Sequence, residues 1–321
     1  MILILSHPDD IHVRHVTPFL SAAGQSFEIL DLSQFPHAAR LTMDYGPSGL
    51  GLFWTAAAQR IDLGRVRAAW WRRPQPFQFE AGLQSADFAR SECDEVFAGL
   101  WQAIPARWIN PPVQDLAASR KSWQLALAQD LGLAPPRTML TNCPQTAQAF
   151  VHDVGEVIYK PFAASQRYWR ETRRFGAAEM RNVKQLRHAP TILQERIAGQ
   201  DIRVTVIGEQ IFAAEIDSSQ GNYADDFRMN ETVVIHAIPT DADLGDAIRA
   251  LMGRMGLVYG ALDFRRDAAT GAWRFLEINP AGQWLFVEEQ TGQPIAQAMA
   301  DQLIKLAQAG ASRQLLDPPI R

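Results

Sequence analysis

The first third of the chain alternates short apolar runs with longer amphipathic stretches, and this alternation restricts the fold more than any other feature. Runs of strand length occupy residues 1–5, 27–32 and 66–71. Helical spacing of apolar residues occupies residues 13–23 and 87–104. Because strands that alternate with helices form a parallel sheet covered by helices, the pattern predicts a doubly wound α/β domain over residues 1–115.

A break at Asn110-Pro111-Pro112 ends this pattern. The following segments predict a small α+β domain over residues 116–197, with a helix at 119–131 and strands at 137–141, 156–160 and 191–195. Its polar, arginine-rich stretch 162–178 is long for a loop in a compact domain, and long loops of this kind are often functional lids.

The remaining segments predict a C-terminal domain over residues 198–321. Its expected strands are 202–207, 210–216, 231–237, 260–265 and 273–279, and its expected helices are 241–255 and 295–309. The first two strands form a hairpin across Gly208-Glu209.

Composition excludes several classes of protein. The 321 residues carry a formal net charge of −4, which gives no general attraction to nucleic acid or anionic lipid. No apolar run approaches the roughly 18 residues that span a bilayer. The two cysteines, Cys93 and Cys143, are too few for a disulfide framework. We therefore expect a cytoplasmic protein that binds neither nucleic acid nor membrane.

Two strand-like runs late in the chain each carry a carboxylate. Asp263 lies in the run 259–264, and Glu277 and Asn279 lie in the run 275–280. Alternation along a strand puts Glu277 and Asn279 on one face, and adjacent strands would bring Asp263 beside them. Two carboxylates and an amide oxygen suit Mg²⁺. The same pattern also fits two solvated acids on a hairpin.

Lysine is scarce, since only four of the 31 basic residues are lysine. Lys160 ends the apolar strand 157–160, and Lys121 begins a helix. A flexible ammonium at such a place can neutralise phosphate oxygens as a point charge. Each lysine, taken alone, also fits an ordinary surface position.

The segment 194–205 is predicted to be a hinge, because a strand ends there, the chain turns at Gly199 and a new strand begins. Ligands often bind in crevices beside such hinges. Backbone groups around residues 195–197 could bind an adenine edge. Asp201 could bind ribose hydroxyls, and Arg203 could meet a phosphate.

Taken in order, these features resemble the ATP-grasp motif set across about two-thirds of the chain. The matching residues are Lys121, Lys160-Pro161, the segment 194–201, Asp263 and Glu277-Ile278-Asn279. The resemblance implies three domains. It implies that ATP and two Mg²⁺ ions are held between two α+β lobes. It also implies ATP-dependent ligation through an acyl-phosphate.

Further segments resemble the microviridin-type macrocyclases, also called graspetide synthetases, over nearly the whole chain. They are Trp70–Pro74, Asn110–Pro112, Pro136–Thr138, Ser219–Arg228 and Asn279–Trp284. This resemblance implies ester or amide crosslinks between side chains of a ribosomal precursor peptide with a leader segment, made by a homodimer. Many ATP-grasp ligases have an arginine where Ala261 stands, and related members often have tryptophan and asparagine at Phe227 and Ala281.

The resemblance implies a role for each site residue. Asp263, Glu277 and Asn279 hold the metal. Lys121, Lys160, Gln194, Glu195, Ile197, Asp201 and Arg203 hold the nucleotide. Arg203, Arg228 and Lys160 act in catalysis, because the anionic peptide carboxylate must approach the anionic γ-phosphate. The stretch 162–178 closes as a lid and keeps water from the acyl-phosphate.

Three other readings stay open. A carboxylate–amine ligase of the glutathione synthetase or ribosomal-protein glutamate ligase type would share the nucleotide site. The run His7-Pro8-Asp9-Asp10 resembles zinc-dependent sugar deacetylases, but it lacks their further acid and their distant histidine. A non-catalytic peptide-binding protein would tend to lose the acidic pair and the lysines, which this chain keeps.

Overall fold

A computed structural model describes residues 1–321 except 48, 58, 163–171, 218–232 and 310–321. The chain forms two compact units. The first contains residues 1–115, 256–259 and 294–321, and the second contains residues 116–255 and 260–293. The predicted domain boundaries after residues 115 and 197 stay predictions. No described helix is long and apolar enough to cross a membrane.

The first unit is built on a parallel sheet with the strand order β2-β1-β6-β7. Its strands are β1 (Ile2–Leu5), β2 (Phe27–Leu30), β6 (Ala68–Trp71) and β7 (Arg107–Ile109). The predicted helices are present as α1 (Ile11–Ala22) and α2 (Ala86–Ala103). Apolar side chains of α2 pack with those of β1 in one core, so the doubly wound α/β prediction is confirmed.

A second, antiparallel sheet lies between β2 and β6 in sequence and was not predicted. It consists of β3 (Ala39–Gly46), β4 (Gly49–Ala56) and β5 (Gln59–Asp62). Alternation explains it, because Ala39, Leu41 and Met43 pack on the core while Arg40 and Thr42 are exposed. Two 3₁₀ turns, Leu32–Gln34 and Leu63–Arg65, flank this insertion.

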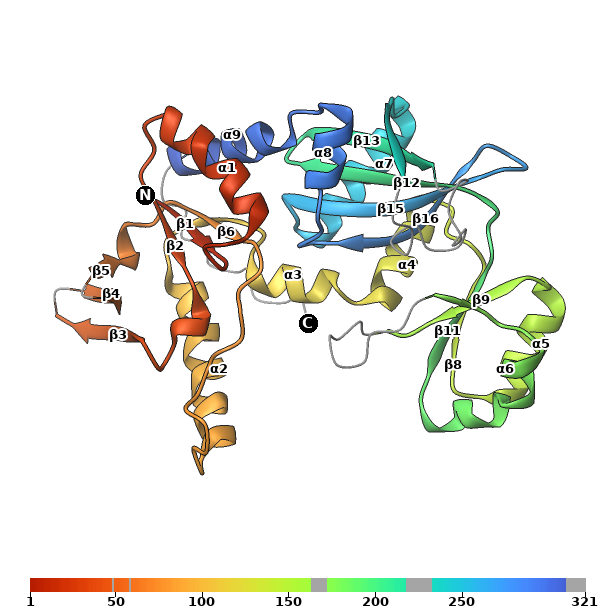
Figure 1. Cartoon of the computed structure of the whole chain (residues 1–321), viewed down its shortest axis with the longest axis horizontal. Helices are drawn as coiled ribbons and strands as arrows, with labels where there is room; N and C mark the ends of the chain where they lie inside the picture. Colours follow the sequence, from red (N-terminus) through yellow and green to blue (C-terminus); the bar gives the residue numbers. More distant parts are fainter. Residues whose placement is uncertain (48, 58, 163–171, 218–232, 310–321) are drawn as a thin grey trace. The chain divides into compact units, whose positions relative to one another are not determined.

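The last helix of the described chain belongs to the first unit. Helix α9 (Ile295–Gln308) packs against α1, β6 and β7 (Figure 1). Helix α3 (Pro112–Ala118) follows β7 and ends in the second unit.

The small sheet of the second unit has the strand order β10-β9-β11-β8 and appears in green in Figure 1. Its strands are β8 (Thr138–Thr141), β9 (Val157–Lys160), β10 (Arg173–Arg174) and β11 (Thr191–Glu195). Helix α5 (Pro144–Val154), helix α6 (Ala177–Arg181) and the 3₁₀ helix Val183–His188 accompany it. Of the predicted lid, residues 163–171 lie outside the described chain.

The larger sheet of the second unit has five strands in the order β14-β13-β12-β15-β16. They are β12 (Gly199–Ile207), β13 (Gln210–Asp217), β14 (Val234–Ile238), β15 (Tyr259–Asp267) and β16 (Trp273–Asn279). Helices α4 (Lys121–Asp130), α7 (Ala242–Met255) and α8 (Leu285–Thr291) belong to the same unit. The other predicted strands and helices of this region are present, and α8 is an addition. Of the predicted strand 231–237, residues 231 and 232 lie outside the described chain, and β14 covers 234–237.

Candidate active site

The antiparallel pair β15–β16 brings the two predicted metal carboxylates together. Asp263 lies directly opposite Glu277, and Ala261 lies opposite Asn279. Both carboxylate side chains are about a quarter exposed, at 23% and 25%. Asn279 Oδ1 accepts a hydrogen bond from the Ala281 backbone N–H at 3.0 Å, so this side chain also shapes the turn after β16. The strand register therefore agrees with the spacing argument.

Each of these carboxylates is paired with a predicted phosphate-binding cation. Arg203 Nε lies 3.2 Å from Asp263 Oδ1, and Lys121 Nζ forms an ion pair with Glu277 Oε2. The Arg203 side chain is nearly buried, and its guanidinium carbon lies 5.6 Å from the centre of the Phe286 ring. Two cations and two anions thus lie together at the sheet, where they can rearrange around an anionic ligand without leaving a buried charge unpaired.

Asp201 has a partner that the sequence argument did not find. Its Oδ1 accepts a hydrogen bond from Arg265 Nη1 at 2.9 Å, and both side chains are buried. Asp201 and Arg203 are two residues apart on β12, so both lie on the same face of the strand. The only sequence signal for this pair was that Arg265 lies two residues after Asp263, and so on the same face of β15. The predicted ribose contact of Asp201 stays a prediction.

The hinge residues lie at the end of β11. Gln194 is fully buried, and its Nε2 donates to Thr138 Oγ1 at 2.9 Å. Its Oε1 has no hydrogen-bond partner among the described residues, and a buried acceptor left this way suits an amino group of a ligand. Glu195 Oε2 accepts from the Arg137 backbone N–H at 3.1 Å, and Ile197 is buried. These groups fit an adenine.

Gly199 joins the small sheet to the large one, and no other residue type fits there. Its φ is +149°, and an added Cβ would lie 1.8 Å from the Arg266 carbonyl oxygen. The neighbouring Ala198 carbonyl accepts a hydrogen bond from the Ala268 N–H at 2.8 Å. The hinge is therefore fixed directly to the turn between β15 and β16.

Not every predicted residue can be placed in this cluster. Lys160 ends β9 opposite Ile192 in the small sheet, and its side chain is partly buried. Arg228 lies outside the described residues, as do the neighbouring Phe227 and Ser219. The departure at Ala261 has a steric reason, since this side chain is fully buried and a Cβ at Gly282 would lie 2.4 Å from its own Cβ. An arginine would not fit there.

Gln124 on α4 was missed by the sequence argument. This side chain is 2% exposed, and its Nε2 donates to the Ile278 carbonyl at 2.8 Å and to the Ala118 carbonyl at 2.6 Å. The Ile278 N–H donates in turn to Gln124 Oε1 at 3.1 Å. A glutamine on the inner side of a helix beside Leu127 and Ala128 was the only available signal.

The donor set fits Mg²⁺ better than a transition metal. Within the described ranges, no three histidine, cysteine, aspartate or glutamate side chains gather as a metal cluster. Mg²⁺ commonly takes one or two protein carboxylates and completes its shell with water and substrate phosphates. Asp263 and Glu277 are the two carboxylates that the prediction assigns to such a site, and Arg203 and Lys121 lie beside them.

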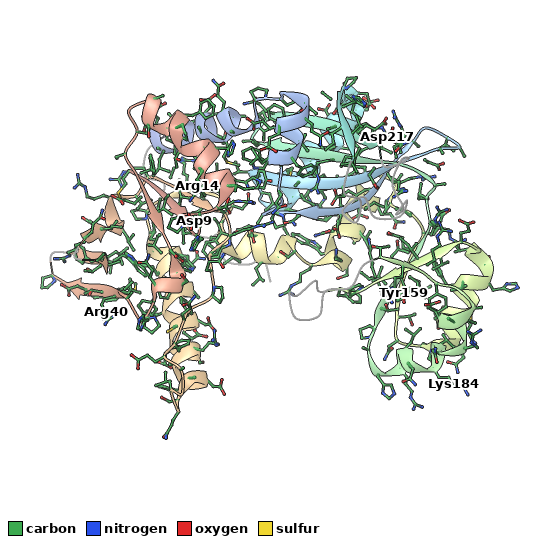
Figure 2. The ribbon with its side chains drawn as sticks, viewed as in Figure 1. Asp9, Arg14, Arg40, Tyr159, Lys184 and Asp217 are labelled. Atoms are coloured by element: carbon green, nitrogen blue, oxygen red, sulfur yellow. The ribbon has the colours of Figure 1, made fainter. Side chains whose placement is uncertain are left out.

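The run His7-Pro8-Asp9-Asp10 performs a structural task in the first unit. Asp10 caps α1, because its Oδ1 accepts from the His12 N–H at 2.8 Å and the Val13 N–H at 3.3 Å. Burial would raise the pKa of the Asp10 carboxyl, but the hydrogen bond with His12 and the charge of Arg72 hold that pKa below its usual range. Asp9 forms an ion pair with Arg14 at the surface (Figure 2). Asp10 therefore has a capping role at the start of this helix.

Comparisons with solved structures cover nearly all of the chain, at 95–97% of its residues. The family described as the MvdD pre-ATP-grasp domain matches residues 1–115. The macrocyclase MdnC of Microcystis aeruginosa MRC, solved with its precursor peptide MdnA, is 25% identical, with a TM-score of 0.85 over 95% of this chain and 99% of that one. The ATP-grasp ligase PsnB, solved with a minimal precursor, Mg and ADP, is 26% identical, with a TM-score of 0.77 over 95% and 97%.

A third solved structure agrees in fold. It is a RiPP-associated ATP-grasp ligase of Chryseobacterium gregarium in complex with ADP and a leader and core peptide. Its identity to this chain is 22%, with a TM-score of 0.86 over 97% of this chain and 98% of that one. No curated protein matches the sequence. The likeness extends over the parallel sheet of the first unit as well as both later sheets.

Proposed function

Because the chain belongs to the ATP-grasp ligases, and residues 1–115 match their MvdD-type pre-ATP-grasp domain, we propose that it crosslinks a ribosomally made precursor peptide. The predicted fold class, an α/β and α+β ATP-grasp fold of three domains, is confirmed. The observation that carries the proposal is the cluster of Asp263, Glu277, Arg203 and Lys121 at the large sheet.

The reaction that we propose begins at a side-chain carboxylate of the peptide. This carboxylate attacks the γ-phosphate of ATP, the bond to ADP breaks, and an acyl-phosphate forms. A serine or threonine hydroxyl or a lysine amine of the same peptide then attacks the acyl carbon and loses its proton, and inorganic phosphate leaves. The product is an ester or an amide, with one water lost from the peptide for each crosslink.

Positively charged side chains of the protein would offset the electrostatic repulsion between the peptide carboxylate and the γ-phosphate. Asp263, Glu277 and Asn279 would hold two Mg²⁺ ions. When bound, these ions would screen the charge of the triphosphate. Lys121 and Lys160 would turn toward phosphate oxygens. Arg203 is nearly buried, so its charge acts in a poorly hydrated site and can hold the transferring phosphoryl group.

The other predicted residues have supporting roles in the proposal. Gln194, Glu195 and Ile197 bind the adenine, and Asp201 binds the ribose. Arg228 orients the acyl-phosphate or the acceptor, and the stretch 162–178 excludes water. The nucleotide would lie between the domains 116–197 and 198–321.

The test uses a peptide encoded by a short reading frame beside the gene, rich in Thr or Ser and in Asp or Glu. The purified chain with ATP and Mg²⁺ should release phosphate and lower the peptide mass by one water per crosslink. Glu277→Gln should abolish the mass loss but keep peptide binding. Normal turnover of Glu277→Gln would refute the metal assignment. Transfer of an added free amine to the peptide, without internal crosslinks, would favour a carboxylate–amine ligase instead.

We also propose that the enzyme acts in the cytoplasm as a homodimer that binds the leader segment of its precursor. The free thiols Cys93 and Cys143 suit a reducing compartment. Exposed apolar side chains on the first unit, Tyr45 at 75% and Phe88 at 67%, suit a contact between copies. A monomeric mass by light scattering at working concentration would contradict the dimer.

A further inference from the structure

The strand that carries Glu277 and Asn279 lies at the edge of its sheet. β16 pairs with β15 on one side, and no described strand lies on its other side. At Ile278, between the two predicted metal ligands, the outer backbone groups are bonded to the side chain of Gln124. The amide takes the place that a neighbouring strand would occupy, because it bonds both the N–H and the C=O of one residue.

We propose that Gln124 is a positioning residue for the metal site, acting on Glu277 and Asn279 through the backbone of Ile278. This inference rests on the proposed function. The Ile278 N–H belongs to the peptide plane that starts at Glu277, and the Ile278 carbonyl belongs to the plane that ends at Asn279. One side-chain amide therefore fixes the two planes from which both predicted ligands project.

The hydrogen bonds leave the amide a single orientation. Nε2 donates to two carbonyls, of Ile278 and Ala118, while Oε1 accepts from the Ile278 N–H. A flipped amide would turn its oxygen toward both carbonyls and its NH₂ group toward an N–H, which loses all three bonds. Because Gln124 is 2% exposed, water cannot replace them.

The same helix also delivers the cation. Lys121 lies three residues before Gln124, so the two side chains share one side of α4. Lys121 pairs with the Glu277 carboxylate, while Gln124 holds the backbone that follows it. Helix α4 thus controls both the charge beside the metal site and the orientation of the strand. Groups that orient metal ligands in this way commonly change metal affinity 10- to 100-fold when they are replaced.

The test compares Gln124→Met with Gln129→Met, an exposed glutamine on the same helix. One measurement is hydrogen exchange of the Ile278 amide in the nucleotide-free protein. The other is the affinity for Mn²⁺, used as a probe for Mg²⁺, in the presence of ADP. Gln124→Met should speed exchange at Ile278 at least ~10-fold and weaken Mn²⁺ binding about 10- to 100-fold. Gln129→Met should change neither.

A further variant keeps the test decisive if Gln124→Met does not fold. Gln124→Asn keeps both a donor and an acceptor on a side chain that is one methylene shorter, so it can keep only part of the three hydrogen bonds, and its effect should lie between those of wild type and Gln124→Met. Wild-type Mn²⁺ affinity in a folded Gln124 variant, or an equal loss in Gln129→Met, would overturn the inference. Glu277→Gln separates the two proposals. If Glu277→Gln binds Mn²⁺ as tightly as the wild type, the metal-site assignment is wrong. If Glu277→Gln weakens Mn²⁺ binding but the Gln124 variants do not, only the positioning role of Gln124 is wrong.

Discussion

Asp115 is the residue in the described chain whose ionisation should show most clearly in stability. It lies in the first turn of α3, and burial raises the pKa of its carboxyl to about 7, although a hydrogen bond with Asn110 opposes the rise. In the unfolded chain the pKa returns to about 4. The folded form therefore holds a proton that the unfolded form loses, and stability falls as pH rises from about 4 to about 7.

Asp115→Asn should remove this loss. At pH 8 the variant should exceed the wild type in free energy of unfolding by about 2–4 kcal/mol, while near pH 4 the two should be equal. Urea unfolding at both pH values measures the difference. Asp94→Asn, at an exposed position on α2, is the matched control and should show no comparable pH dependence. A gain for Asp115→Asn that is the same at both pH values would show that the carboxyl is not buried in the way described.

At the residue scale, sequence reasoning succeeded where alternation alone decides a position. Asp263 and Glu277 face each other because each lies at a fixed place in an alternating strand. The roles of Gln124 and Arg265 depend on partners 154 and 64 residues away. Neither residue type has a local preference that reveals such a partner, so these contacts could not be predicted.

The contact between β12 and β15 includes a buried ion pair whose energy can be dissected. Removing one partner of such a pair leaves the other charge buried and costs about 3–5 kcal/mol, whereas replacing both by apolar groups is often nearly neutral. We therefore expect Asp201→Leu and Arg265→Met each to destabilise the protein by roughly that amount. The double variant should recover most of the loss, as measured by chemical denaturation.

The double variant also tests the predicted ribose contact of Asp201. If Asp201 binds only Arg265, the stable double variant should keep the wild-type KM for ATP. If Asp201 also binds the nucleotide, KM should rise while stability stays near that of the wild type. A loss in the double variant equal to the sum of the two single-variant losses would mean that the two side chains are not coupled.

At the element scale, long periodic segments were predictable and short or inserted ones were not. Helices α2 and α7 and strands β12 and β15 agree with their expected ranges to within a few residues. The insertion β3–β5 was missed although its residues alternate between apolar and polar. The prediction relied on strands that alternate with helices, and this insertion contains strands alone. Helix α5 was missed because its start, at Cys143 and Pro144, lacks a side-chain cap.

At the scale of the whole molecule, the chain leaves the first unit after residue 115 and returns to it twice, at 256–259 and at 294. Asn110 binds the first of these returning segments, because its Oδ1 accepts hydrogen bonds from the Val258 and Tyr259 N–H groups at 2.8 and 2.9 Å. Periodicity predicted a helix over 295–309 but could not tell which sheet it would cover. An amphipathic helix fits any apolar face of the right size, so its partner is decided by tertiary structure alone.

The first unit should therefore depend on the end of the chain. Helix α9 buries six apolar side chains, Ile295, Ala296, Ala298, Met299, Ala300 and Leu303. The three large ones contribute about 5–9 kcal/mol, which is comparable to the whole stability of a typical domain. A chain that stops at Gln293 would expose the inner face of α1, with Val13, Val16 and Leu20, to water.

We expect the chain 1–293 to lose the fold of its first unit, while the chain 1–309, which keeps α9, should melt like the full-length protein. Circular dichroism and limited proteolysis measure this, and cleavage should begin within residues 1–115 of the shorter chain. The second unit, which contains Asp263 and Glu277, should resist protease longer, because its sheets are built from residues 116–255 and 260–293. A cooperative transition of 1–293 at the wild-type temperature would mean that α1 and the parallel sheet are stable without α9, and that residues 1–115 fold as a domain on their own.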